Sequence, residues 1–187
     1  HRRSSAASDV YKRQLLPTVN GVNTISACYG VICTDYVIDI DSGLPVELFA
    51  SLSQTSDVNS VTINADETVT AYAYAVDQYG NLVTTEVISF IASNGSIDSN
   101  GVFSPYASGQ QTITAQWVGV SSTLEENLIV EVLPGAPSEV ELSGCTITLT
   151  ADSSCDLFAS AFDQFGNLVW FDDCLLYTSD AADDLRC

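Results

Sequence analysis

The sequence has no methionine, one histidine and only five Lys or Arg residues. All six basic side chains lie outside positions 15–173, and these positions hold 20 of the 24 acidic residues. A segment with this charge repels nucleic acid and anionic membrane surfaces, so we expect no nucleic-acid partner. Its stability should instead depend on solvent cations, which screen charges over a Debye length of about 8 Å at physiological salt.

The same absence of basic side chains argues against catalysis. Without His, Lys or Arg in 15–173, the segment lacks the common general bases, Schiff-base amines and oxyanion-stabilising cations. A pair of carboxylates can cleave glycosides, but no pair stands out from the acidic background. We therefore expect a protein that is not an enzyme and has no organic cofactor.

Two further absences concern the extent of the chain. No apolar run reaches 18 residues, so we expect no membrane span in this sequence. Because there is no Met, we expect the natural start of the protein to lie outside the sequence.

What the sequence does contain is a long internal repeat. The stretch Asp77–Val83 reads Asp-Gln-Tyr-Gly-Asn-Leu-Val, and it returns 86 residues later as Asp163–Val169 with Phe in place of Tyr. Apolar and small residues alternate before each copy, at Tyr72–Ala75 and at Phe158–Ala161. Each copy therefore predicts a strand, a tight turn and a second strand. The turn-forming residues, whose Gly-Asn pair we expect at positive φ, are Asp77, Gly80 and Asn81, and Asp163, Gly166 and Asn167.

Matches outside the turn divide the chain into units. Gly43-Leu44-Pro45 matches Gly135-Ala136-Pro137, and Gly21–Ala27 parallels Gly109–Ala115. We expect residues 15–42 to be the C-terminal strands of a truncated repeat, 43–134 a complete repeat, and 135–173 the N-terminal strands of a third. A complete unit can bury its own core, whereas the flanking pieces have lost partner strands.

Within the complete unit, short strands follow one another at regular spacing and no stretch has helical periodicity. This pattern predicts an all-β fold, a Greek-key sandwich of two packed antiparallel sheets. Trp117 and Trp170, on expected strands, are predicted to be core residues. The main expected strands are Val46–Leu52, Val61–Ile63, Thr68–Val76, Leu82–Thr84, Val87–Ala92, Gln111–Val118 and Asn127–Leu133.

The two ends of the sequence are set apart from the fold. Ser4–Gln14 can be encoded by a DNA string whose reverse complement, in another reading frame, gives Cys174–Asp183. That string resembles a transposase adaptor used in sequencing libraries. We therefore interpret residues 1–14 and 174–187 as translated adaptor and exclude them from the fold prediction.

The repeat resembles bacterial and archaeal immunoglobulin-like tandem repeats of the invasin/intimin type. The resemblance implies immunoglobulin-like units in tandem, and a secreted or cell-surface protein acting as stalk or adhesion modules. Neighbouring repeats would be the partners, with a cell-surface protein or glycan as a further ligand. The alternative is a carbohydrate- or calcium-binding accessory module of a larger secreted enzyme. The matching positions are Ala75, Asp77, Gly80, Asn81 and Val83; Ala92-Ser93-Asn94-Gly95 with Ile97; Gly101 with Phe103; and Gly109, Ile113 and Ala115.

Four cysteines lie between the excluded ends, which is a departure from many such repeats. Cys28 and Cys33 flank a predicted hairpin turn, and Cys145 and Cys155 join the first two strands of the third unit. Metal binding is the competing interpretation, but zinc sites usually have closer Cys-x-x-Cys spacing or His ligands. We predict two local disulfides, Cys28–Cys33 and Cys145–Cys155, and hence an oxidising, extracytoplasmic setting.

Calcium is the remaining candidate ligand. Asp77 and Asp163 begin turns, and the acidic linker residues Asp39 and Asp41 precede the complete unit. Carboxylate and carbonyl oxygens gathered at one end of a sandwich are the ligands that Ca²⁺ prefers. In the other interpretation, which we favour, Asp77 only accepts backbone N–H bonds in its turn.

Overall fold

The computed structural model describes residues 14–145, 148, 150 and 153–170, with the backbone of 175–176 and 185–186. Across these residues the fold is all-β, as predicted, and contains no helix. It follows that no helix of the described part is long and apolar enough to cross a membrane. Most of the two ends interpreted as adaptor, including Cys174 and Cys187, lies outside the described residues.

Residues 47–133 form a β-sandwich that occupies the middle of the chain. Its strands follow the predicted positions closely, although the last one begins at Thr123 rather than at Asn127. The strands are β3 (Glu47–Ser51), β4 (Ser60–Asn64), β5 (Val69–Thr70), β6 (Tyr72–Val76), β7 (Leu82–Val83), β8 (Ser89–Ala92), β9 (Ser96–Ile97), β10 (Val102–Ser104), β11 (Gly109–Val118) and β12 (Thr123–Leu133).

The strand order is that of an immunoglobulin-like Greek key. One sheet has the order β4-β12-β11-β8. In the facing layer, β5 and β6 follow each other and form nearly one strand. Along one edge this strand pairs with β3, and along the other edge it pairs with β7 and β10. The layer ends with β9, which pairs with β10. The chain therefore crosses repeatedly between two layers, as in immunoglobulin sandwiches.

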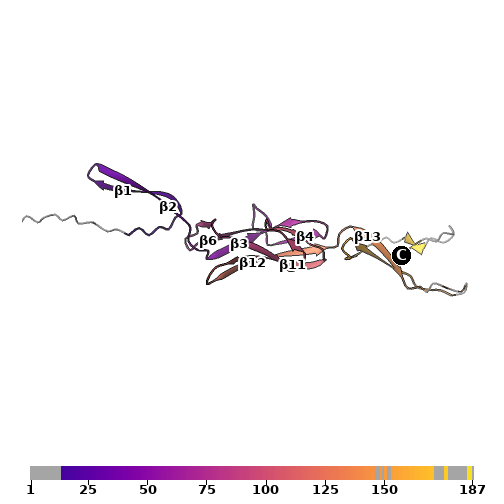
Figure 1. The fold of residues 1–187 in the computed structure, drawn as a ribbon. Coiled ribbons are helices and arrows are strands. Elements are labelled where there is room, and N and C mark those ends of the chain that lie inside the picture. Colours follow the sequence, from indigo (N-terminus) through magenta and orange to yellow (C-terminus); the bar gives the residue numbers. More distant parts are fainter. Residues whose placement is uncertain are drawn as a thin grey trace, which may run out of the picture.

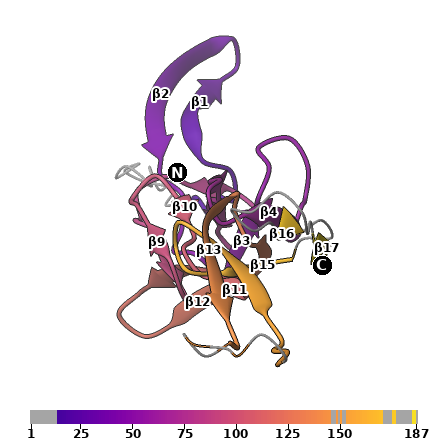
Figure 2. The same ribbon diagram turned by 90° about the vertical axis from the view of Figure 1, so that its right-hand side faces the viewer.

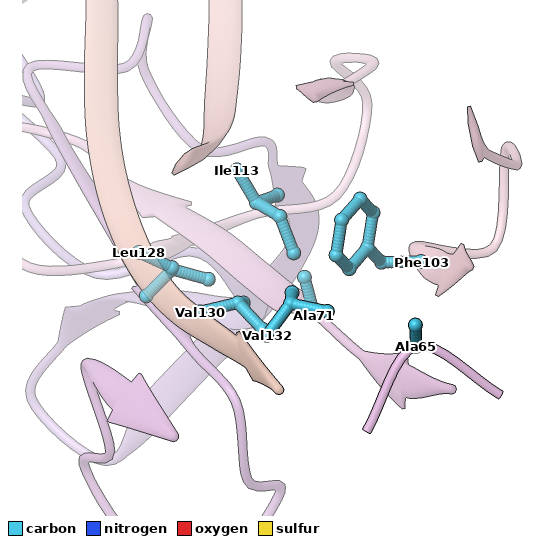
Figure 3. Close-up of a cluster of buried hydrophobic side chains, with 7 residues drawn as sticks. All are labelled: Ala65, Ala71, Phe103, Ile113, Leu128, Val130 and Val132. Atoms are coloured by element: carbon cyan, nitrogen blue, oxygen red, sulfur yellow. The ribbon is translucent and has the colours of Figure 1, made fainter. Parts of the chain in front are cut away.

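Alternation along the long strands supplies the core between the layers. In β11, Ile113 and Ala115 are fully buried, and in β12 the buried residues are Leu128, Val130 and Val132. Successive side chains of a strand point to opposite faces, so each of these strands presents one apolar face. Phe103 of β10, with no exposed surface, comes from the opposite layer and packs against these residues (Figure 3).

Shorter elements extend from the two ends of the sandwich (Figures 1 and 2). The hairpin of β1 (Gly21–Tyr29) and β2 (Ile32–Ile40) lies at one end and stands clear of the other strands. At the other end, β13 (Pro137–Ser143), β14 (Phe158–Asp163) and β15 (Leu168–Val169) form a three-stranded sheet. The backbone of β16 (Leu175–Leu176) pairs with that of β17 (Leu185–Arg186).

Three details differ from the sequence predictions. The sheets are not wholly antiparallel, because β4 pairs with β12 in parallel. A parallel neighbour has no tight hairpin connection, so the sequence carries no local signal for it. In the turn, Gly80 has a φ of 81°, but no residue other than glycine has positive φ in the described chain, so Asn81 does not. Trp117 is buried at 3% exposure, whereas Trp170, which comes directly after the edge strand β15, is 89% exposed.

Candidate inter-repeat junctions

The repeated turn is built around the carboxylate of Asp77. Oδ1 accepts hydrogen bonds from the backbone N–H groups of Tyr79 and Asn81, both at 2.9 Å, and Oδ2 accepts one from Gly43 N–H at 2.8 Å. The Asn81 side-chain amide donates to the same carboxylate, at 2.9 Å from Oδ2. Asp77 is only 3% exposed, and these donors replace the water that it loses on burial.

These donors stabilise the ionised form of Asp77. The side-chain amide of Asn81 is the largest cause, and the backbone N–H groups of Gly43, Asn81 and Tyr79 add to it against the opposing effect of burial. The pKa of Asp77 is therefore held well below that of an ordinary aspartate. At neutral pH the turn contains a fixed negative charge that is fully hydrogen-bonded.

The second copy reproduces this geometry at Asp163. Its Oδ1 accepts hydrogen bonds from Phe165 and Asn167 N–H at 2.9 Å, and its Oδ2 accepts one from Gly135 N–H at 2.8 Å. Burial alone would raise the pKa of Asp163, but the Asn167 amide and the three N–H groups outweigh it and lower the pKa. Both copies thus bind a glycine that lies a few residues before the strand paired with their own, Gly43 before β3 in one case and Gly135 before β13 in the other.

The asparagine of each turn also reaches backward, to the segment that precedes the unit in the chain. Asn81 Nδ2 donates to the carbonyl oxygen of Thr18 at 3.0 Å, and Asn81 Oδ1 accepts from Asn20 N–H at 3.3 Å. In the second copy, Asn167 Nδ2 donates to the carbonyl oxygen of Tyr106 at 3.1 Å. Asn167 Oδ1 accepts from Ser108 N–H at 2.8 Å. One amide therefore joins Asp77 to residues 18–20, and its counterpart joins Asp163 to residues 106–108.

These contacts go to backbone atoms, which explains how one turn sequence can serve two places. The contacted residues differ between the copies and so do their side chains: Thr18 and Asn20 in one copy, Tyr106 and Ser108 in the other. A carbonyl oxygen and an N–H are present at almost any residue. The turn therefore requires a particular backbone shape from its neighbour and no particular side chain.

The sequence analysis identified the turns but missed the segments that they contact. A signal was present, because Pro17-x-x-x-Gly21 and Pro105-x-x-x-Gly109 match at the same spacing, immediately before β1 and β11. Each contacted segment lies inside this Pro-to-Gly stretch. Its pairing with a turn about 60 residues away cannot be read from local periodicity, since the contact is tertiary.

The calcium candidates are only partly brought together. Asp41 and Asp77 line the same small pocket at the first junction, together with Pro17, Thr18 and Asn81. Asp39 lies in β2 opposite Val22, and Asp163 belongs to the second junction. Within the described part of the chain, no three acidic, His or Cys side chains gather as metal ligands. Both oxygens of Asp77 already accept N–H bonds, so a cation bound there would compete with the turn.

Both pairs of internal cysteines are bonded in the structure. Cys28 and Cys33 face each other in the register of β1 and β2, with Cα atoms 4.1 Å apart. Cys145 and Cys155 are also linked, with a Cα–Cα distance of 5.5 Å, and close the connection between β13 and β14. Each bridge ties together one element outside the central sandwich.

Comparison with known proteins gives limited information. No protein-family model matches the chain, and neither does any curated protein. Among solved structures, the chain is similar to InvD of Yersinia pseudotuberculosis at 20% sequence identity, with a TM-score of 0.48. The similarity covers 81% of this chain and 52% of the InvD chain, so the chain spans about half the length of that structure. We take no functional argument from this likeness, and the immunoglobulin-like topology rests on the strand order described above.

Proposed function

We propose that the chain is a non-catalytic part of a secreted or cell-surface protein, in which tandem immunoglobulin-like units form a stalk or adhesive array. The observation that carries this proposal is the repeated junction. The same Asp-Gln-aromatic-Gly-Asn turn contacts the preceding segment through the same atoms at two places 86 residues apart. A contact that recurs with the period of the repeat can fix the orientation of each unit relative to its neighbour.

The geometry of the junction favours a stiff connection. Asp77 binds the linker at Gly43, and Asn81 binds the segment before the previous hairpin, so the linker and the neighbour are held by adjacent side chains. A short linker with such contacts restricts the relative motion of units far more than a free polar linker does. An array with one junction per unit would therefore extend as a rod, which suits a stalk.

The elements at the two ends support the tandem reading. The β1–β2 hairpin begins at a glycine, Gly21, as the β11–β12 hairpin begins at Gly109. At the other end, β13, β14 and β15 pair in the order in which β3, β6 and β7 pair in the sandwich. We infer that residues 15–42 and 135–173 are parts of further units. The first would hold the positions of β11 and β12, and the second those of β3, β6 and β7.

The proposed location follows from the covalent chemistry. Disulfides such as Cys28–Cys33 and Cys145–Cys155 persist in oxidising compartments and are rare in the cytosol. The acidic segment without basic residues is compatible with an exposed, well-solvated surface. Together they favour a position outside the cytoplasm.

Sequencing the DNA that flanks this segment in its source tests the proposal. We expect further copies of the unit, each with a Pro-x-x-x-Gly stretch and an Asp-x-x-Gly-Asn turn. A catalytic domain directly beside the sandwich, with no further copies, would overturn the array in favour of an accessory module of a secreted enzyme.

A further inference from the structure

The outer face of the β3–β6 strand pair carries three aromatic side chains, Phe49, Tyr72 and Tyr74. Their neighbours Leu48 and Ala75 point into the core, at 4% and 1% exposure. Phe49 and Tyr74 are opposite each other in the register, and their rings stack with centroids 5.0 Å apart and an interplanar angle of 20°. Phe49 is 36% and Tyr74 51% exposed, so the pair leaves an apolar surface in contact with water, which we call the aromatic platform.

The loop after β3 encloses a pocket over this platform. Residues 53–57 and the three aromatic side chains line a pocket of about 480 Å³, within the range of roughly 300–1,000 Å³ that is usual for small-molecule sites. Ser51 shapes the loop, since its Oγ donates to the Ser56 carbonyl at 2.7 Å and accepts from Ser53 and Val58 N–H. The pocket wall is therefore held in place before any ligand arrives.

The same pocket contains polar groups that the fold does not use. The side chains of Gln54 and Asp57 make no hydrogen bond within the described residues, and neither do the hydroxyls of Tyr72 and Tyr74. The amide of Gln54 and the two phenols can both donate and accept hydrogen bonds, and the carboxylate of Asp57 can accept them. A ligand with an apolar face and a rim of hydroxyl groups would complement this arrangement.

The second copy of the strand pair shows that the scaffold does not need the aromatic platform. By register, Phe49 and Tyr74 correspond to Glu141 and Ser160 in β13 and β14, which pair in the same way. Cross-strand aromatic pairs do contribute to sheet stability, but here the same strand pairing forms without one. The second copy thus lacks the platform although its strands pair in the same way.

From these observations we propose that this pocket binds a short neutral saccharide. A sugar ring can pack its C–H groups against the exposed surface of Phe49 and Tyr74 while its hydroxyls bond to Gln54, Asp57 and the phenols. Acidic sugars would be repelled, because Asp57 lines the pocket, Glu47 lies nearby in β3, and positions 15–173 contain no basic residue. The pocket does not involve the junction residues, so the proposal stands apart from the stalk function.

Titration calorimetry of the full chain tests the site with a panel of trisaccharides and one charged tripeptide. The neutral probes are maltotriose, cellotriose and triacetylchitotriose, and trigalacturonic acid and trilysine are the charged ones. We expect at least one neutral probe to bind, and the affinity to fall about tenfold or more in Tyr74→Ser and Phe49→Ala, as for an aromatic residue at the centre of a site.

Tyr36→Ser is the matched control, since Tyr36 is 70% exposed on β2, opposite Ile25, and does not line the pocket. It should bind and melt as the parent does. Phe49→Ala and Tyr74→Ser should still unfold in one cooperative transition, at a slightly lower temperature because the cross-strand aromatic pair is lost. Tyr74→Ser introduces the residue found in the second copy, so it should fold. Absence of binding by every neutral probe, unchanged binding in Tyr74→Ser, or binding of a charged probe alone would each overturn the proposal.

Discussion

The strand pair β3–β6 and its counterpart β13–β14 have the same register but very different surroundings. In the sandwich, Leu48 is 4% exposed, because the β11–β12 layer covers it. At the corresponding position of the second copy, Val140 is 66% exposed. The turn and its hydrogen bonds are nevertheless the same in both copies. Local sequence is thus sufficient for strand and turn, whereas burial requires the opposing sheet.

The largest expected effect is a difference in the loss of stability when Leu48 or Val140 is truncated to alanine. Leu48→Ala should lower the free energy of unfolding of the sandwich by about 2–5 kcal/mol, because it leaves a cavity in a packed core. Val140→Ala should change the stability of its own sheet by about 0.5 kcal/mol or less, because the side chain is already in water. Urea denaturation followed through the fluorescence of Trp117 measures the stability of the sandwich. Amide exchange at Ala161 measures the stability of the β13–β15 sheet. Equal effects would mean that a covering layer is present over Val140 in solution.

Acid should weaken the turn through Asp77. Its pKa is lowered in the folded state, so its contribution to stability is fully present above the ordinary pKa of aspartate, about 3.9, and is lost as the pH falls toward the folded value. Asp77→Asn should therefore melt at a lower temperature than the parent at pH 6, and this difference should shrink by pH 2. Comparing variant with parent cancels the effect of neutralising the other carboxylates. A difference independent of pH would show that the charge of Asp77 does not contribute.

Salt should raise the melting temperature smoothly through screening of the acidic segment. Because N–H groups already occupy both oxygens of Asp77, we expect calcium to do no more than NaCl at matched ionic strength. Saturation at micromolar to millimolar calcium, abolished by Asp77→Ala, would instead establish a coordinated site near Asp41 and Asp77.

The smallest effect is expected from reduction of the disulfides. No cysteine lies between residues 43 and 134, so a reductant should leave the melting of the sandwich unchanged. It should increase amide exchange in the β1–β2 hairpin and between β13 and β14, whose loops the bridges close. Peptide mapping without reductant should recover the two local pairs, and mixed pairs between them would contradict the structure.

The sequence was informative wherever the determinant is local. Alternation, short apolar runs and turn signals located most strands of the sandwich, and the Cys28–Cys33 spacing matched a cross-strand pair. The parallel pairing of β4 with β12 was not predicted, since it depends on which edge strand is free after folding. The contact of Asn81 with Thr18 was missed for a similar reason, because it joins a side-chain amide to the backbone of a residue 63 positions earlier in the chain. The pocket over Phe49 depends on the path of the loop after β3, which no periodic pattern specifies.

In the proposed array, Asn81 and Asn167 fix each unit against the one before it. Residual dipolar couplings of the full chain measure the relative orientation of the hairpin, the sandwich and the β13–β15 sheet. Asn81→Ala should release only the hairpin, and Asn167→Ala only the β13–β15 sheet, while both leave the fold of the sandwich intact. Asn100→Ala is the control, because Asn100 makes a similar bond to Asp98 within the sandwich and touches no neighbouring unit. One shared alignment for the whole parent chain, lost selectively in each variant, is the predicted result. Independent alignment of the three parts in the parent chain, or no change in either variant, would contradict the account.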